Sequence, residues 1–216
     1  MKIGIIGGTF NPVHNAHLRI AEEVGEMFFL DRVVFIPSAS PPHKPLAGEL
    51  AFRQRFRMVE LAIRDNPRFA VSDLEGQRGG KSYSVDTLRV LRAEHPDDEF
   101  FFIIGSDSFL EIGQWREYRE IFSLCNIVAV ERPGSRIPDP SAVLPVAIAG
   151  EFCYHGPEKR LAHRSGYSVY CCSGVPLAIS SSSIRKLVRL DRSIRYLVPE
   201  AVAHFIKEHR LYKDAH

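Results

Sequence analysis

The sequence predicts an α/β protein with a doubly wound, mainly parallel sheet and a small helical part at the C-terminus. Short apolar runs alternate with amphipathic stretches at least four times, which is the pattern of a parallel sheet covered by helices. The runs are continuously apolar, as expected for strands buried on both faces. The length of 216 residues suits a single domain over 1–216, with 180–216 as a helical subregion.

The predicted strands are short apolar segments that stop at Gly, Pro or Arg. The most apolar is Glu99–Gly105, in which Phe100 to Ile104 are all Phe or Ile. The remaining predicted strands are Lys2–Gly7, Arg32–Pro37, Phe69–Leu74, Asn126–Val130 and Ser168–Cys172. The segment Arg136–Arg164 has the weakest pattern, and we expect a mobile or variable insert there.

Apolar residues spaced three and four apart predict the helices between these strands. The predicted helices follow His14–His17, span Phe52–Ile63, lie around Val85–Leu91, and occupy the tail near Ser182–Arg189 and Pro199–His209. In a sheet of this kind, ligands bind beyond the carboxyl ends of the strands. Residues that directly follow a strand are therefore the first candidates for a functional site.

Composition and charge exclude several classes of function. A net charge of +2 is too small to indicate a nucleic-acid or membrane partner. No stretch approaches the roughly 20 apolar residues of a membrane span, and the apolar run after Lys2 is too short for a secretory signal. We therefore expect a cytoplasmic protein that is a monomer or a small homo-oligomer.

The four cysteines lack the two-residue gap of a zinc or redox motif. We expect reduced structural thiols, and a metal or redox site near the C-terminus stays open as an alternative because Cys and His both occur there. Three familiar motifs also fail. Gly79–Ser82 resembles the end of a P-loop, but Glu75 stands where the P-loop has its first Gly. Neither G-x-G-x-x-G nor G-x-S-x-G is present.

The span Gly7–His17, between the first predicted strand and helix, carries the strongest signal in the chain. Its two glycines allow close approach of a ligand to the backbone. His14 and His17 are three residues apart at a helix start, so they share one face. Helix-start amides attract phosphate. The alternative is a tight turn with two capping or core histidines, but the coincidence of all these features in one short span favours an anion site.

This span resembles the (H/T)-x-G-H signature of the nucleotidyltransferase superfamily, and most closely its nicotinate-nucleotide adenylyltransferases, whose version reads roughly G-G-T-F-[DN]-P-x-H-x-G-H. Ala16 stands where the signature has Gly. Other stretches match the family in the same order. Pro41–Lys44 resembles its P-P-H-K loop, Ser82–Leu88 its S-Y-T-x-D-T-L, Ile103–Asp107 with Trp115 its I-I-G-x-D…W, and Ile179–Arg185 its I-S-S-T-x-I-R.

The resemblance implies a Rossmann-like nucleotidyltransferase fold and the attack of a mononucleotide phosphate on the α-phosphorus of ATP. Such a phosphate is already largely dianionic at pH 7, so the task is positioning and charge stabilisation. The implied catalytic residues are His14, His17, Lys44 and Arg185. The implied ATP-binding residues are Gly7, Gly8, Thr9, Phe10, Gly105, Asp107, Ser181 and Ser182. Mg²⁺ is expected to accompany ATP without a full protein cage, and no protein metal ligand is assigned.

Several of these roles compete with structural ones. Ser182 is expected to cap a helix that points at phosphate, whereas an ordinary helix cap is the alternative for Ser180–Ser183. Asp107 is expected to accept ribose hydroxyl hydrogens, and its alternative is also a helix cap. Lys44 could be a solvated loop lysine rather than a phosphate ligand.

The resemblance further implies nicotinate mononucleotide as the acceptor. Its ring would stack on Trp115, and its carboxylate would meet the backbone N–H groups of Ser84 and Arg116. Two donors favour a carboxylate over an amide, because an amide would turn an NH₂ group toward a donor. The alternative for Trp115 is a plain core residue.

Three rival functions remain. The same chemistry could serve another acceptor, such as nicotinamide mononucleotide or phosphopantetheine. A nucleotide-binding regulator could keep the fold without the reaction, for which Ala16 is the one supporting feature. An aminoacyl-tRNA synthetase fragment shares the H-x-G-H logic, but the short length and the lack of a K-M-S-K-S-like loop argue against it.

Overall fold

The computed structural model describes residues 1–40, 50–131, 137, 139–158, 160–174 and 177–213. Within these residues, eight strands form one sheet in the order β3-β2-β1-β4-β5-β8-β7-β6. This order, with β1 between β2 and β4, confirms the predicted doubly wound α/β fold. No helix in the described part is both long and apolar enough to cross a membrane.

The chain divides into two compact units, and each is made of three separate segments. Unit 1 comprises Met1–Ile6, Ile20–Val33 and Tyr83–Leu177, and unit 2 comprises Gly7–Arg19, Val34–Ser82 and Ala178–His216. The predicted organisation as one domain stays a prediction.

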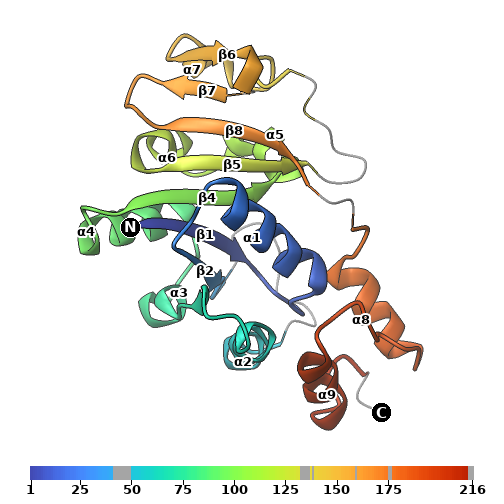
Figure 1. Cartoon of the computed structure of the whole chain (residues 1–216). Coiled ribbons are helices and arrows are strands. Elements are labelled where there is room, and N and C mark those ends of the chain that lie inside the picture. Colours follow the sequence, from blue (N-terminus) through green and yellow to red (C-terminus); the bar gives the residue numbers. More distant parts are fainter. Residues whose placement is uncertain (41–49, 132–136, 138, 159, 175–176, 214–216) are drawn as a thin grey trace. The chain divides into compact units, whose positions relative to one another are not determined.

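Unit 1 is built on parallel strands (Figure 1). The start of β1 (Lys2–Gly8) pairs in parallel with β4 (Glu99–Gly105), which pairs in parallel with β5 (Asn126–Glu131), and β5 pairs in the same way with β8 (Ser168–Ser173). β4 is buried after its first residue, because its run of Phe and Ile has neighbours on both sides.

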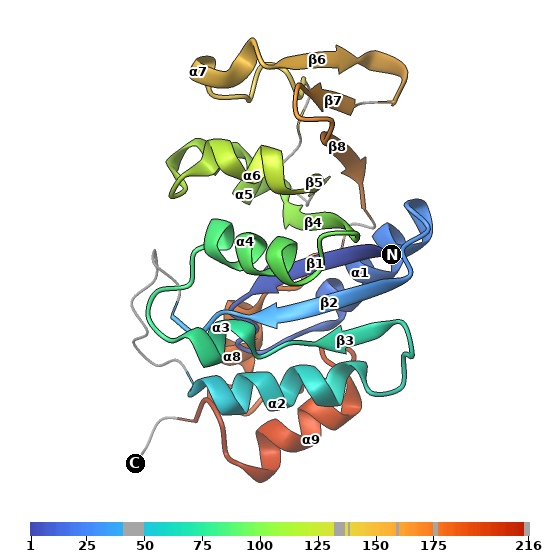
Figure 2. The same ribbon diagram turned by 90° about the vertical axis from the view of Figure 1, so that its left-hand side faces the viewer.

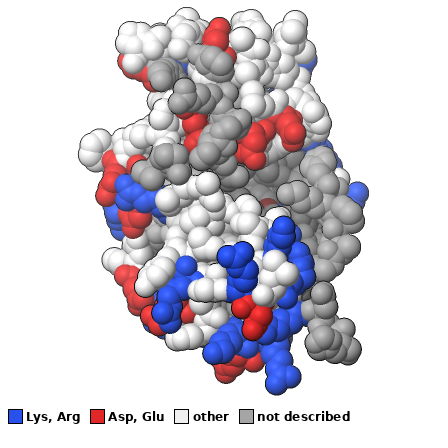
Figure 3. All heavy atoms as spheres, turned by 90° about the vertical axis from the view of Figure 1, so that its right-hand side faces the viewer, with Lys and Arg blue, Asp and Glu red and all other residues white. Residues whose placement is uncertain are grey.

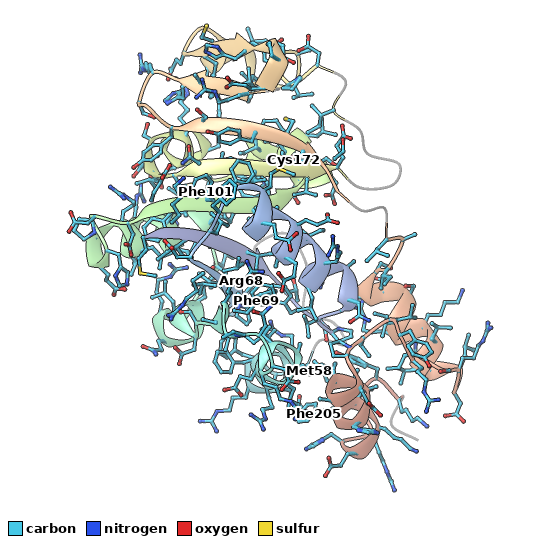
Figure 4. All side chains as sticks on the ribbon, viewed as in Figure 1. Met58, Arg68, Phe69, Phe101, Cys172 and Phe205 are labelled. Atoms are coloured by element: carbon cyan, nitrogen blue, oxygen red, sulfur yellow. The ribbon has the colours of Figure 1, made fainter. Side chains whose placement is uncertain are left out.

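Helices cover both faces of these strands. Figure 2 shows α4 (Ser84–Glu94), α5 (Ser106–Leu110) and α6 (Tyr118–Leu124) on one face, whereas α1 (Asn15–Met27) lies on the other. On the α1 face, Phe28 contacts the rings of Phe101 and Tyr170 at centroid distances of 5.3 and 4.9 Å. Figure 4 labels Phe101 on β4 and Cys172 on β8.

The segment predicted to be an insert is a structured edge of the sheet. It contains α7 (Val146–Ala149), β6 (Phe152–His155), the short 3₁₀ helix η2 (Gly156–Glu158) and β7 (Arg160–His163). β6 pairs antiparallel with β7, and β7 pairs antiparallel with β8. These elements were not predicted because the strands have only four residues each, too few to show a period. The expected mobility or variability of the segment stays a prediction.

A buried histidine holds this antiparallel edge. The His163 side chain is 4% exposed. Its Nε2 lies 3.1 Å from a Glu151 carboxylate oxygen, and its Nδ1 lies 2.8 Å from the Ser165 hydroxyl. These two contacts join β7 to the end of α7 and to the turn before β8.

Unit 2 contains α2 (Phe52–Ile63), β3 (Phe69–Val71), α3 (Leu74–Arg78), α8 (Ser181–Arg189) and α9 (Glu200–Glu208), together with most of β2 (Arg32–Pro37). α2 packs against α9, as Figure 2 shows. Figure 4 labels Met58 on α2, which is fully buried, and Phe205 on α9, which is partly exposed.

The predicted long elements lie close to the observed ones, and most errors concern short elements. α2, β2 and β4 have the predicted bounds. The strand predicted over Phe69–Leu74 ends at Val71, and α3 begins at Leu74. The short helices α3, α5 and α6, with the 3₁₀ helix η1 (Ile112–Gln114), were not predicted, because one or two turns carry too little periodicity.

Candidate functional site

Unit 2 contains the turn between β1 and α1, which carries the glycine–histidine span. Gly7, Gly8 and Thr9 lead to Phe10, whose φ of 48° is unusual for a residue with a side chain. Phe10 is 2% exposed, and its ring lies 5.8 Å from that of Phe35. A Cβ at Gly8 would lie 3.3 Å from the Phe10 ring, so Gly8 allows this close packing.

His14 and His17 are brought together by this turn. Their rings stack at a centroid distance of 3.7 Å and an interplanar angle of 20°. The His14 backbone N–H donates to His17 Nδ1 over 3.2 Å. Since Nδ1 accepts this bond, a neutral His17 carries its proton on Nε2, which is then a hydrogen-bond donor. The geometry therefore orients at least one imidazole as a donor.

Ala16 lies within α1 and is 7% exposed. Its backbone is helical rather than left-handed, so the position does not require glycine. The substitution of the signature Gly is compatible with the backbone of the turn.

The first half of α8 (Ser181–Arg189) binds the backbone of the same span. The Ser181 hydroxyl donates to the Pro12 carbonyl over 2.8 Å, and Arg185 Nη1 donates to the Asn11 carbonyl over 2.7 Å. Arg185 Nη2 also donates to the Ser182 hydroxyl over 3.2 Å. A guanidinium has five N–H donors, so these two bonds leave capacity for an anion.

The cap of α8 is Ser180 and not the predicted Ser182. The Ser180 hydroxyl accepts from the Ser183 backbone N–H over 3.1 Å. Ser182 is already the second helical residue, and a cap side chain has to lie outside the first turn. The serine run therefore combines a helix cap at Ser180 with contacts to the turn and to Arg185.

The C-terminal segment adds further contacts that the sequence analysis missed. The Tyr212 hydroxyl donates to Asn11 Oδ1 over 2.8 Å, and Asn15 Nδ2 donates to the Tyr196 carbonyl over 2.7 Å. Asn11 itself is 3% exposed. No short motif links positions this far apart in sequence, so only the fold brings them together.

Arg55 on α2 was also missed, although it is 1% exposed and charged. Its guanidinium donates to the carbonyls of Thr9, Leu50 and Ala39 over 2.8, 3.1 and 3.4 Å. Arg55 thus holds the glycine turn and the residues on either side of the segment 41–49. Its place on the apolar face of the predicted helix, three residues after Phe52, was the available signal.

The predicted Lys44 lies outside the described residues. The residues before its loop are held by Ser82, whose hydroxyl accepts from the backbone N–H groups of Ala39 and Ser40 over 2.9 and 3.2 Å.

The residues predicted to bind the acceptor ring belong to unit 1. Ser84 is the first residue of α4, whose preceding residue, Tyr83, provides no side-chain cap. The first amides of a helix have no partner within the helix. The position of Ser84 is therefore compatible with the predicted role of its N–H as a donor.

Trp115 directly follows η1 and is partly exposed, which disfavours the alternative of a plain core residue. Its ring lies edge-on to Phe102 at a centroid distance of 6.2 Å. The Arg116 guanidinium lies 4.7 Å from the centre of the Tyr83 ring, so Arg116 contacts the start of α4.

Gly105 ends β4 and caps α5, and Asp107 lies exposed in the first turn of that helix. Asp107 lies just past the strand, as predicted. The alternative of a helix cap is wrong for Asp107, because Gly105 is the cap of α5 and Asp107 is already its second helical residue. The role as a ribose ligand stays a prediction.

Basic side chains gather on one face of unit 2. In the lower part of Figure 3, Lys and Arg side chains are concentrated on the face that carries α8. The exposed ones on α8 and the following loop are Lys186, Arg189, Arg192 and Arg195. Cationic side chains near Arg185 favour a polyanionic ligand.

Cysteines and clustered metal ligands contribute little. The four cysteines, all among the described residues, form no disulfide bond. Burial raises the pKa of the Cys125 thiol to about 12, so it stays protonated. In the part of the chain that the structure describes, no group of three or more His, Cys, Asp and Glu could hold a metal ion.

Comparison with known families and sequences gives a consistent result. The model of the cytidylyltransferase-like family matches residues 5–187. A probable nicotinate-nucleotide adenylyltransferase of Geotalea uraniireducens is 70% identical over the whole of both chains. One of the same name from Geobacter metallireducens is 70% identical over 98% of each chain.

Among solved structures, the nicotinic acid mononucleotide adenylyltransferase of Plasmodium falciparum complexed with NaAD has a similar fold. Its TM-score is 0.76 at 20% identity, and the match covers 98% of this chain and 97% of that one. A second structure of that enzyme, complexed with APC, has a TM-score of 0.74 at 19% identity. The match covers 98% of this chain and 96% of that one. These likenesses confirm the nucleotidyltransferase type of the Rossmann-like fold.

Proposed function

Since the chain belongs to the nicotinate-nucleotide adenylyltransferases within the cytidylyltransferase-like family, we propose that it transfers the adenylyl group of ATP to nicotinate mononucleotide. The products are nicotinate adenine dinucleotide and pyrophosphate, a step of NAD biosynthesis. The observation that carries the proposal is the stacked His14–His17 pair in a turn whose carbonyls are bound by Ser181 and Arg185.

In the proposed reaction, a phosphate oxygen of nicotinate mononucleotide attacks the α-phosphorus of ATP. The bond from that phosphorus to the bridging oxygen breaks, and the electron pair leaves with pyrophosphate. The attacking phosphate is largely dianionic, so no general base is needed. His14 and His17 donate to phosphate oxygens as charge develops, and Arg185 holds the departing pyrophosphate. Lys44 supplies a further cation, and Gly7 to Phe10 with Ser181 and Ser182 line the ATP phosphates.

Mg²⁺ is proposed to enter with ATP. The side chains of the turn and of α8 that we assign to phosphate are imidazole, guanidinium and hydroxyl groups, which suit phosphate oxygens rather than a hard cation. This donor set fits an ion held mainly by the nucleotide and by water. When bound, Mg²⁺ would neutralise phosphate charge.

For the acceptor, we assign the Ser84 and Arg116 N–H groups to the ring carboxylate and Trp115 to the ring face. Two N–H donors suit a carboxylate and disfavour an amide at the same place. Gly105 and Asp107 are assigned to the ATP ribose. The partial exposure of Trp115, and the contact of its neighbour Arg116 with Tyr83 at the start of α4, support this assignment.

We also propose that the enzyme works in the cytoplasm, as a monomer or small homo-oligomer, without a nucleic-acid or membrane partner. This rests on the small net charge of the chain and on its substrates being soluble nucleotides.

The test is a reaction of the purified protein with Mg-ATP and nicotinate mononucleotide, in which pyrophosphate and the dinucleotide are both quantified. The proposal expects the two products in equal amounts. Binding of ATP without either product would instead favour a nucleotide-binding regulator, and activity restricted to phosphopantetheine would identify a different acceptor.

A further inference from the structure

Arg89, which is not among the site residues assigned above, is the centre of an ion-pair network in unit 1. From the second turn of α4, its Nε donates to a Glu120 carboxylate oxygen over 2.8 Å, and its Nη2 contacts both Glu117 and Glu120. Its Nη1 lies 3.2 Å from Asp86, one turn earlier on α4. One guanidinium thus ties three carboxylates from two elements.

Arg116 extends the network to the residues assigned to the ring. Its Nη1 lies 3.6 Å from the second Asp86 oxygen, and its Nε donates to Glu117 over 3.1 Å. Glu117 has a φ of 48°, a left-handed conformation that costs energy for a residue with a side chain. The two arginines bind the carboxylate of this strained residue, and so hold the segment Trp115–Glu117.

We propose that Arg89 is a positioning residue for the acceptor subsite: it fixes the segment Trp115–Glu117 against the start of α4. The position of the Arg116 amide relative to the Ser84 amide then depends on the network, and not only on the backbone of the segment Trp115–Glu117. This inference rests on the proposed function, because that function assigns these amides to the ring carboxylate.

Charge gives Arg89 a second effect on the same subsite. The network brings three carboxylates, Asp86, Glu117 and Glu120, close to the place assigned to an anionic ring substituent. Arg89 neutralises them in part, and their side chains are 27% to 43% exposed, so the compensation is partly screened by salt. Loss of Arg89 should therefore weaken the binding of nicotinate mononucleotide more than the binding of nicotinamide mononucleotide.

The experiment uses Trp115, the only tryptophan of the chain, as the probe. Nicotinate mononucleotide and nicotinamide mononucleotide are titrated separately into the wild type and Arg89→Met, and the tryptophan fluorescence gives each dissociation constant. The KM of each substrate is measured in parallel by pyrophosphate release. We expect Arg89→Met to bind the acid about five- to tenfold more weakly, the scale of a partly exposed ion-pair network. The KM for ATP should stay within about twofold, and Arg89→Lys should recover part of the loss.

The matched control is Arg92→Met, one turn further along α4. Arg92 donates to the Asp98 carbonyl over 2.7 Å and stacks on Phe100, away from the network. Arg92→Met should therefore bind nicotinate mononucleotide as tightly as the wild type does. Acid binding of Arg89→Met equal to that of the wild type, or equal losses in both variants, would overturn the inference.

Two outcomes separate this inference from the proposed function. If the wild type binds the acid but forms no pyrophosphate, the proposed function fails while the binding comparison still tests Arg89. If Arg89→Met does not fold, Glu117→Gln removes one anchor of the same network. Because this change also removes a negative charge near the place assigned to the acid, the amide gives the cleaner readout. Its binding should weaken as Trp115 loses its fixed position, and unchanged amide binding would refute the positioning role.

Discussion

Each of the two units uses an arginine to hold a functional segment, and the two arginines do so by different means. In unit 2, Arg55 is almost fully buried and binds three neutral backbone carbonyls. In unit 1, Arg89 is 36% exposed and binds three carboxylates. The buried clamp holds the turn assigned to ATP, and the exposed network holds the segment assigned to the acceptor.

The difference teaches how firmly each segment is fixed. Donors to buried carbonyls are hardly affected by salt or pH, because neither partner titrates and water is excluded. Exposed ion pairs are weaker and respond to both. The turn assigned to ATP is therefore expected to be the more rigid of the two segments, and the segment assigned to the acceptor the more adjustable one.

The largest expected effect concerns the histidine pair in the turn assigned to ATP. His14→Ala and His17→Ala should each lower kcat by about 10²–10³, the usual cost of removing one donor to developing charge. The thermal midpoint should change little for His17, which is partly exposed. His204→Ala, an exposed histidine on α9, is the control and should retain full activity. Normal turnover in His17→Ala would remove the main support for the ATP site.

The next effect tests the buried clamp directly. Arg55→Met leaves three carbonyls without this donor and should lower the free energy of unfolding by about 2–5 kcal/mol. Urea unfolding at low and high salt measures it. Because Arg55 is only 1% exposed, salt hardly reaches its contacts, and the loss should change little between the two salt concentrations. A loss due to Arg89→Met should instead shrink at high salt. A salt-dependent loss in Arg55→Met would contradict the comparison.

A smaller effect is expected at the start of α8. Ser180→Ala removes the helix cap and should cost about 1 kcal/mol in urea unfolding. Ser182→Ala, two positions later, should cost less, because Ser182 does not cap the helix. Equal costs would mean that the contact of Ser182 with Arg185 matters as much as the cap.

The smallest effect is the pH dependence of the stability that the Arg89 network contributes. Hydrogen bonds from Arg89 hold the pKa values of Glu117 and Glu120 below their ordinary value of 4.5. Depressed pKa values stabilise the fold fully above pH 4.5, and this contribution disappears as the pH falls through the folded-state values. The urea midpoints of wild type and Arg89→Met should therefore converge on acidification below about pH 4.5. A constant difference would show that these carboxylates do not contribute.

The sequence predicted the central architecture because its signals are local and long. Glu99–Gly105 is one apolar run, and the Gly7–His17 span places glycines, histidines and a helix start together. Ser181 and Arg185 were predicted as ligands through the resemblance of Ile179–Arg185 to the family motif. Their contacts with Pro12 and Asn11 could not be predicted in this way.

What the sequence did not predict depends on distant parts of the chain. Arg55 meets Thr9 from a separate helix, and Tyr212 meets Asn11 across almost the whole chain. Likewise, the contact of Arg89 with Glu117 joins two helical regions whose spacing follows from the fold. The four-residue strands of the antiparallel edge were missed because they are too short for a pattern.

The most direct test of the account is a competition between the two acceptors in one reaction. The wild type is given Mg-ATP with equal concentrations of nicotinate mononucleotide and nicotinamide mononucleotide, and the two dinucleotide products are quantified. The account predicts about 10²-fold or more of the acid product, because the proposal assigns two N–H donors to the ring substituent. Equal amounts, or an excess of the amide product, would keep the adenylyl transfer but contradict the roles given to Ser84, Trp115 and Arg116.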